Sequence, residues 1–231
     1  MSAIVIDPLS YRIETSSLAA VLHVPEKGGQ IDIVRRLARE AKRHARPKAI
    51  YSIAYIEDRG DDFVITDGVR LSSRVLRVNL DGLQRFFLYV VTSGLELEGW
   101  ANGHEDMLVR FYADAINQLV LRSAVDDFRE RLRKLYGLGQ LSAMNPGSLD
   151  DWPLEEQSVL FGLLGDVAGA IGVALTDSLL MVPTKSVSGV FFPTEETFAS
   201  CQLCPRESCP NRRAPYDAEL FDRKYAEALV S

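Results

Sequence analysis

One stretch of this chain carries more information about its fold than any other, namely Met181-Val182-Pro183-Thr184-Lys185-Ser186-Val187-Ser188-Gly189-Val190-Phe191-Phe192. Residues 186–192 are rich in the β-branched and aromatic side chains that strands favour. A mostly apolar run, 178–182, precedes them, and a proline begins the short interval between the two runs. Because proline commonly marks a turn, we predict two strands, 178–182 and 186–192, that flank a turn.

Further elements are predicted from the hydrophobic pattern on both sides of the central part of the chain. Residues 86–92 form a continuous apolar run ended by Ser93-Gly94, which is typical of a buried strand. Residues 74–80 alternate polar and apolar side chains, which predicts another strand. A polar, glycine-containing interval between 49–56 and 63–65 predicts a hairpin. Apolar residues at helical spacing predict three helices, at 31–45, 105–135 and 154–164.

Composition places the chain among ordinary soluble proteins. Hydrophobic residues make up 47% and charged residues 25% of its 231 residues, enough to build a core in one large domain or two small ones. The formal net charge of −6 argues against nucleic acid as a partner, since phosphate binding requires a basic face. No apolar run is long enough for a membrane span, and the N-terminus lacks the pattern of a signal peptide. We therefore expect a cytoplasmic location with no membrane partner.

All three cysteines of the chain lie within nine residues, in the run Cys201-Gln202-Leu203-Cys204-Pro205-Arg206-Glu207-Ser208-Cys209-Pro210. A CxxC step lets one tight turn direct two thiolates at a single metal or cluster. Both Cys204 and Cys209 precede proline, a step that also closes the bacterial ferredoxin cysteine run, and this favours an iron–sulfur cluster over zinc. A [4Fe-4S] cluster is expected, with structural zinc or metal-free thiols as the alternatives.

Three cysteines leave one position of a closed four-ligand site open. A partner, a small molecule or another side chain could fill this position, or it could stay open. The sequence offers four further candidate side chains: His23, His44, His104 and Asp217. Arg212 and Arg213, which follow the cysteines, could tune the potential of a cluster, face a partner, or cap the loop.

Three stretches of the chain together resemble a known family. They are Val91-Thr92-Ser93-Gly94-Leu95-Glu96, then Asn145-Pro146-Gly147 followed by Trp152-Pro153-Leu154-Glu155, and the stretch 181–192 quoted above. They are similar to the reactivation domain of cobalamin-dependent methionine synthase and to small stand-alone relatives found beside corrinoid methyltransferases. The cysteine cluster resembles what those stand-alone relatives carry. The resemblance implies an α+β fold around a bent, largely antiparallel sheet over residues 1–200, followed by a metal or iron–sulfur segment at 201–231.

The resemblance also implies a ligand site, with departures from the family pattern. The family binds S-adenosylmethionine partly through RxxxGY, where this chain has Ala143, Gly147 and Ser148. A methyl group cannot replace a guanidinium that grips a carboxylate. Phe191 stands where the family has a tyrosine. The candidate cofactor-binding residues are Asn145, Gly147, Ser148, Trp152 and Phe191, and the alternative is that they are turn and core residues.

These observations predict an accessory protein for the reductive reactivation of a corrinoid methyltransferase, Co(II) to Co(I), through an iron–sulfur cluster. The partners implied are a corrinoid protein, or corrinoid methyltransferase, and an electron-donor protein. One alternative is an interaction protein that zinc staples without redox chemistry. Another is a methyl-donor domain that binds S-adenosylmethionine and remethylates cobalamin. No catalytic residue is assigned by the sequence.

Overall fold

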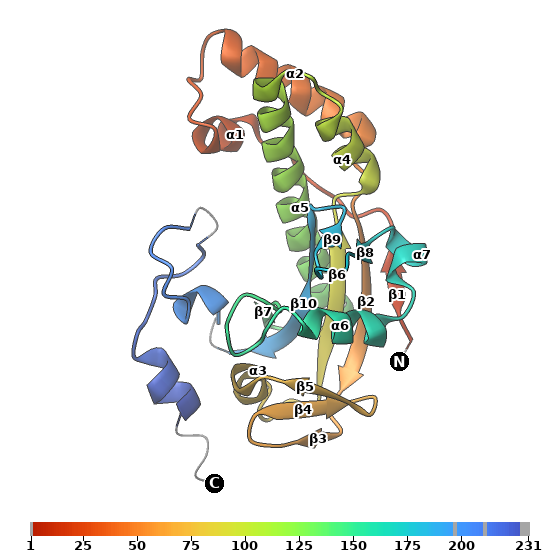
Figure 1. Ribbon diagram of the computed structural model, residues 1–231, viewed down its shortest axis with the longest axis vertical. Helices are drawn as coiled ribbons and strands as arrows, with labels where there is room; N and C mark the ends of the chain where they lie inside the picture. Colours follow the sequence, from red (N-terminus) through yellow and green to blue (C-terminus); the bar gives the residue numbers. More distant parts are fainter. Residues whose placement is uncertain (1, 196–197, 210–211, 227–231) are drawn as a thin grey trace.

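The computed structural model describes residues 2–195, 198–209 and 212–226 (Figure 1). Its centre is a five-stranded sheet in the order β1-β2-β6-β10-β7, in which all neighbouring strands are antiparallel. These strands are Ile4–Ile6 (β1), Lys48–Tyr55 (β2), Arg85–Thr92 (β6), Ser186–Thr194 (β10) and Gln140–Met144 (β7). The predicted α+β class with a largely antiparallel sheet is confirmed.

The sheet is buried on both faces. Alternate residues of β6 join different core clusters: Phe86, Leu88 and Val90 on one face, and Phe87, Tyr89 and Val91 on the other. The long helix α5, Met107–Tyr136, covers the second face, while helices α6 and α7, Glu156–Leu164 and Val167–Ile171, pack against the first. A strand buried on both sides reads as a continuous apolar run, which is why β6 could be predicted from its sequence.

Smaller elements occupy the two ends of the molecule (Figure 1). At one end, three helices pack with the N-terminal half of α5; they are Thr15–Val21 (α1), Gly29–His44 (α2) and Leu95–Asn102 (α4). At the other end lies a three-stranded sheet of Asp58–Arg59 (β3), Phe63–Thr66 (β4) and Val69–Ser72 (β5), beside helix Arg74–Asn79 (α3). A two-stranded ribbon joins Ala174–Leu175 (β8) to Met181–Val182 (β9). The three predicted helices are confirmed as α2, α5 and α6.

The predicted hairpin between 49–56 and 63–65 is wrong. β2 pairs with β1 and β6 inside the large sheet, whereas β4 pairs with β3 and β5 in the small one. The two β-rich runs are close in sequence, but the large sheet offers β2 a fully buried partner in β6, and hydrophobic burial outweighs sequence proximity.

The strand predicted at 74–80 is also wrong, because this segment forms α3. Ser73 caps the helix by accepting a hydrogen bond from the Leu76 amide at 2.9 Å. The distant Asp151 accepts hydrogen bonds from the Ser73 hydroxyl and from the amide of Val75, the latter at 3.0 Å. Two side chains therefore satisfy amides at the start of this helix, which stabilises it against the strand alternative.

The strand predicted at 178–182 is shorter than expected. Only Met181 and Val182 are in a strand, because residues 176–180 form the turn that connects β8 to β9. The Thr176 side chain accepts a hydrogen bond from the Leu180 amide at 3.1 Å, and Leu179 has a φ of 63°. The predicted strand 186–192 is confirmed within β10.

The C-terminal segment runs beside β7, and its last described residues contact α3 (Figure 1). It contains a 3₁₀ turn, Ser200–Gln202, and a π-helix, Phe221–Ala226. Tyr225 is 0% exposed and packs in the core cluster under the sheet, and Arg74 donates a hydrogen bond to the Ala226 carbonyl at 2.8 Å. The segment is thus docked on the rest of the protein, and the division at residue 200 stays a prediction.

Candidate functional site

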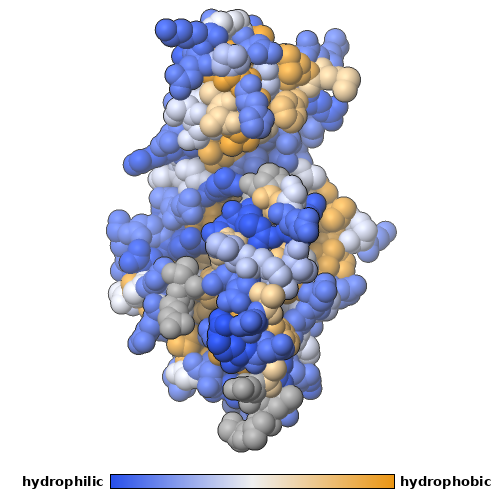
Figure 2. Space-filling view, turned by 90° about the vertical axis from the view of Figure 1, so that its left-hand side faces the viewer, coloured by the Kyte–Doolittle hydropathy of each residue, from blue (hydrophilic) through white to orange (hydrophobic). Residues whose placement is uncertain are grey.

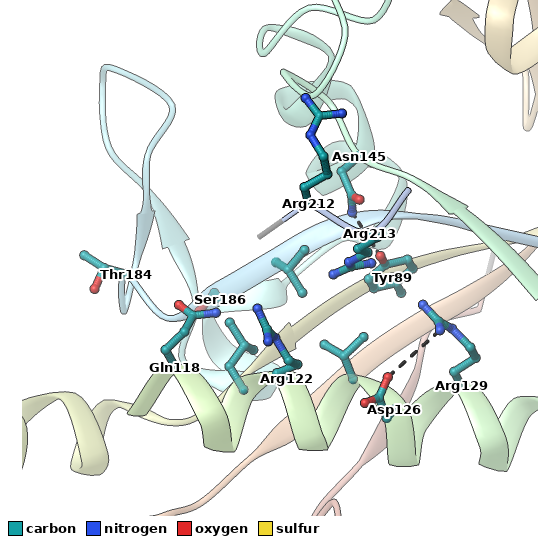
Figure 3. A pocket seen from close by; sticks show the side chains of 13 residues that line it. Tyr89, Gln118, Arg122, Asp126, Arg129, Asn145, Thr184, Ser186, Arg212 and Arg213 are labelled. Atoms are coloured by element: carbon teal, nitrogen blue, oxygen red, sulfur yellow. Dashed lines mark hydrogen bonds and ion pairs between the residues drawn. The ribbon is translucent and has the colours of Figure 1, made fainter. Parts of the chain in front are cut away.

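Two adjoining cavities lie between α5, β10, the loop that follows β7, and the C-terminal segment. The smaller measures about 510 Å³ and the larger about 700 Å³, and both are lined by Arg129, Asn145 and Arg213. We call the pair of cavities the cleft. Figure 3 shows the smaller cavity, with α5 on one side and the C-terminal arginines on the other. Both sets of residues singled out from the sequence, the loop at 145–148 and the cysteines, line the larger cavity.

Asn145 is held in place by two buried hydrogen-bond acceptors. Its side-chain nitrogen donates to the Ser188 carbonyl at 2.7 Å and to the Tyr89 hydroxyl at 3.0 Å. Burial raises the pKa of Tyr89, while the Asn145 hydrogen bond and the nearby arginines act in the opposite direction. The floor of the cleft is therefore a fixed amide beside a buried phenol.

Gly189 makes this arrangement possible, because a Cβ at this position would lie 2.3 Å from the Met144 carbonyl oxygen and 2.5 Å from the Asn145 side-chain nitrogen. We expect Gly189→Ala to lower the free energy of unfolding by about 1–3 kcal/mol, as overpacking does in other cores. Equilibrium denaturation measures the change.

Gly162→Ala in α6 is the matched control for this substitution. Apart from the chain neighbours of Gly162 and the backbone of its own helix, no atom lies within 4 Å of a Cβ added at this position. Alanine in a helix interior is more stable than glycine by about 0.5–1 kcal/mol, so the control should be neutral or stabilised. If the two variants unfolded at the same denaturant concentration, the close approach at Gly189 would not contribute to the free energy of unfolding.

The loop after β7 places Gly147 and Ser148 at the edge of the larger cavity. Gly147 has a φ of 76°, a left-handed conformation that favours glycine, and its amide donates to the Trp152 carbonyl at 2.8 Å. The Ser148 amide donates to the Asn145 carbonyl at 3.1 Å. Ala143, at the position of the family arginine, also lines this cavity and leaves it without a guanidinium there.

Trp152 and Phe191, both predicted as cofactor-binding residues, are core residues that line neither cavity. Trp152 is 0% exposed in the core cluster with α6, and its indole nitrogen donates to Glu156 at 3.4 Å. Phe191 is 0% exposed and stacks on Tyr89 with ring centroids 4.2 Å apart. The Arg129 guanidinium lies 5.1 Å from the Phe191 ring centroid. These aromatic side chains support the residues that line the cleft.

The three cysteines are partly buried, and all line the larger cavity. The Arg212 guanidinium organises their loop: it donates to the carbonyls of Cys201 at 3.0 Å and Cys204 at 3.3 Å, and also to that of Arg206. The Arg213 amide donates to the Cys201 sulfur at 3.4 Å. Sulfur is a ligand that soft metals and iron–sulfur clusters prefer, so the type of donor atom at this cavity suits such a site.

The cysteines supply suitable ligand atoms, but their arrangement is not that of a metal site. Within residues 2–195, 198–209 and 212–226, no three His, Cys, Asp or Glu side chains lie close enough to hold one metal ion. Pro210, which forms the second Cys-Pro step, lies outside the described residues. The cysteines thus offer suitable ligand atoms, but the three sulfurs do not converge on one point in this structure, and their joint binding of a metal or cluster stays a prediction.

The fourth-ligand candidates are occupied or lie elsewhere in the fold. Asp217 pairs with Arg223 at 2.9 Å, and this hydrogen bond lowers the pKa of its carboxyl group. His44 stacks on Trp100, and His104 packs edge-on against the same ring. His23 lies directly after α1, in the helical end of the molecule. None of these side chains lines the larger cavity.

Sequence reasoning missed the basic character of the cleft. Arg122 and Arg129 project from α5 into the smaller cavity, and neither was singled out from the sequence. Their spacing of seven residues places them on one helix face, together with the partly apolar lining from Leu121 and Val125. This spacing is the feature of the sequence from which a basic face of the helix could have been predicted.

No protein-family model matches the sequence, and no curated protein matches it. The structure, however, is similar to a solved one, the MetH reactivation domain bound to AdoHcy, with a TM-score of 0.62. The match covers 86% of this chain and 82% of that chain, at 17% sequence identity. This chain has the reactivation-domain fold. The resemblance predicted from three short stretches is thus confirmed at the level of fold.

The view in Figure 2, from the side that carries the C-terminal segment, shows a predominantly hydrophilic surface at mid-height. In the described part of the chain, no helix is long and apolar enough to cross a membrane.

Proposed function

We propose that this protein assists the reductive reactivation of a corrinoid protein, in which inactive Co(II) is returned to Co(I). One observation carries the proposal: the cysteine segment and the loop at 145–148 line the same cavity. In the family that the sequence resembles, the corresponding loop lies at the ligand site of a domain that docks on a cobalamin module. A redox group on the cysteines would then lie beside the docking region.

Cys201, Cys204 and Cys209 are the proposed ligands of an iron–sulfur cluster, most simply a [4Fe-4S] cluster. When bound, such a cluster supplies one-electron transfer at potentials that reach about −700 mV at the extreme, low enough for Co(II) reduction. The residues of the chain hold the ligands: Arg212 fixes the loop carbonyls, and the Arg213 amide donates to the Cys201 sulfur. Hydrogen bonds to sulfur are one of the levers that set cluster potential.

The electron balance requires two partners. A separate electron-donor protein supplies one electron, and the Co(II) of a corrinoid protein or corrinoid methyltransferase accepts it to give Co(I). All three cysteines keep part of their surface exposed, so both partners could approach them. Residues 1–200 would provide the docking surface and 201–231 the metal segment.

S-adenosylmethionine binding is the second candidate function, with methyl transfer to the cobalt of the partner. It is favoured by the AdoHcy bound to the similar solved structure and by the loop at 145–148, which lines the larger cavity here. Against it, Ala143 offers no guanidinium to the ligand carboxylate. Calorimetry with S-adenosylmethionine separates the candidates, since absence of heat and of a thermal shift removes this one.

Anaerobic purification followed by iron, acid-labile sulfide and zinc analysis tests the cluster. We expect iron and sulfide, a brown colour, and an EPR signal on reduction. Zinc in a colourless protein would support the alternative of a zinc-stapled interaction protein. A protein free of both metals would remove the metal site altogether.

A further inference from the structure

The smaller cavity of the cleft is lined by more positively than negatively charged side chains. Four arginines and one carboxylate line it, an excess of three positive charges in a protein whose net charge is −6. These charged residues are Arg122, Asp126, Arg129, Arg212 and Arg213. Concentrating cations in a concave site costs free energy through mutual repulsion, and an anion in the cavity would offset that cost.

The arginines reach the cavity from two opposite sides (Figure 3). Arg122 and Arg129 come from α5, whereas Arg213 comes from the C-terminal segment and lies beside Tyr89. Arg212 contributes charge but few free donors, because its guanidinium is bonded to loop carbonyls. The cavity is therefore a gap between cationic walls that a small ligand could bridge.

The hydrogen-bonding capacity of Arg129 is incompletely used. The Arg129 Nε atom is buried and has no hydrogen-bond partner among the described residues. Its ion pair with Asp126 is long, 3.9 Å, and the Asp126 side chain is 69% exposed. No carboxylate of the described residues pairs with Arg213 either. A buried guanidinium nitrogen without a partner, as at Arg129, is unusual and points to a missing acceptor.

We propose that the smaller cavity binds a phosphate-bearing small molecule. A phosphate group carries nearly two negative charges at neutral pH and offers three acceptor oxygens, which suits several converging guanidinium groups better than a single carboxylate does. Asn145 and Tyr89 supply polar groups on the floor. The volume of about 510 Å³ falls within the range of small-molecule sites.

This ligand would also connect the sheet domain to the cysteines. Arg213 presents its side chain to the smaller cavity, and its amide donates to the Cys201 sulfur in the larger one. A phosphate that bridges Arg122 of α5 and Arg213 would hold the cysteine segment against α5. The inference goes beyond the proposed redox function, because the binding site contains no cysteine.

Calorimetric titration of the full chain with inorganic pyrophosphate at low ionic strength tests the site. We expect saturable binding that weakens at least about tenfold in Arg122→Ala and in Arg213→Ala, since each removes a charge-assisted contact. Arg110→Ala is the matched control, because Arg110 lies on the same helix but outside the cleft, bonded to Asn102. The Arg110→Ala variant should bind pyrophosphate as tightly as the unsubstituted protein does.

Hydrogen exchange on the unmodified protein provides a second measurement. It tests the site even if an arginine variant fails to fold. Pyrophosphate should slow amide exchange in residues 201–213 and leave α2 unaffected. The proposal is overturned if millimolar pyrophosphate gives neither heat nor protection, or if all three arginine variants lose affinity equally. Both measurements use metal-free protein. A negative result with pyrophosphate therefore does not count against the proposed cluster, and absence of a cluster does not count against the phosphate site.

Discussion

Trp152→Ala is expected to lower the free energy of unfolding by about 3–5 kcal/mol, the usual cost of removing a large buried aromatic side chain. Trp152 is 0% exposed and is the largest fully buried side chain in the core cluster beneath the sheet. Its backbone carbonyl also accepts the Gly147 amide, so the loss extends to the loop that borders the cleft. Equilibrium denaturation with urea measures the change.

Trp100→Ala provides the matched control, because Trp100 is only partly buried in the helical end of the molecule and lies outside the cleft. We expect a clearly smaller loss of stability for this variant. If Trp152→Ala unfolded at the urea concentration of the unsubstituted protein, the placement of this side chain in the core would be wrong. Its interpretation as a ligand-binding residue would then return.

Cys204→Ser is expected to reduce bound iron to background. Serine is a poor ligand for the soft metals that thiolate holds, and only two cysteines would remain for the cluster. Iron and sulfide analysis after anaerobic purification gives the result directly. Because Cys204 is partly exposed, the variant should keep the fold and melt close to the unsubstituted protein.

Ser208→Ala controls for disturbance of the loop, since this exposed residue lies between the second and third cysteines. It should retain full iron content. Iron retained at the same level by Cys204→Ser would mean that the cysteines do not bind the metal.

The parts of the fold that the sequence predicted well are those whose signal is local. β6 is a continuous apolar run, and α5 combines a periodic apolar pattern with a cap at each end, Asp106 and Gly137. β10 is rich in β-branched and aromatic residues, and its stretch also supplied the resemblance to the reactivation domain. Such signals need no knowledge of distant residues.

The wrong predictions concern segments whose structure depends on residues that are distant in the sequence. Residues 74–80 alternate like a strand, but Asp151 accepts hydrogen bonds from the amides at the start of this segment and helps to make it a helix. β2 pairs with β6 rather than with its neighbour in sequence, because the large sheet buries it. The meeting of Arg213 with the arginines of α5 was missed for the same reason, since these residues come together only in the folded protein.

The candidate site was predicted in its parts but not in its arrangement. The loop at 145–148 and the cysteines were each identified from their sequences, while their meeting in one cavity depends on the path of the C-terminal segment beside β7. Phe191 shows the opposite case. Its position in a motif suggested a ligand contact, yet the side chain stacks beneath the cleft on Tyr89.

Transfer of one electron to a corrinoid is the central claim, and EPR of Co(II) tests it most directly. A corrinoid methyltransferase subunit held in the Co(II) state is mixed anaerobically with the reduced, iron-loaded protein, and with the Cys204→Ser variant treated in the same way. We expect the Co(II) signal to decrease with the unsubstituted protein and to persist with the variant. A Co(II) signal that the iron-loaded, reduced protein leaves unchanged would contradict it.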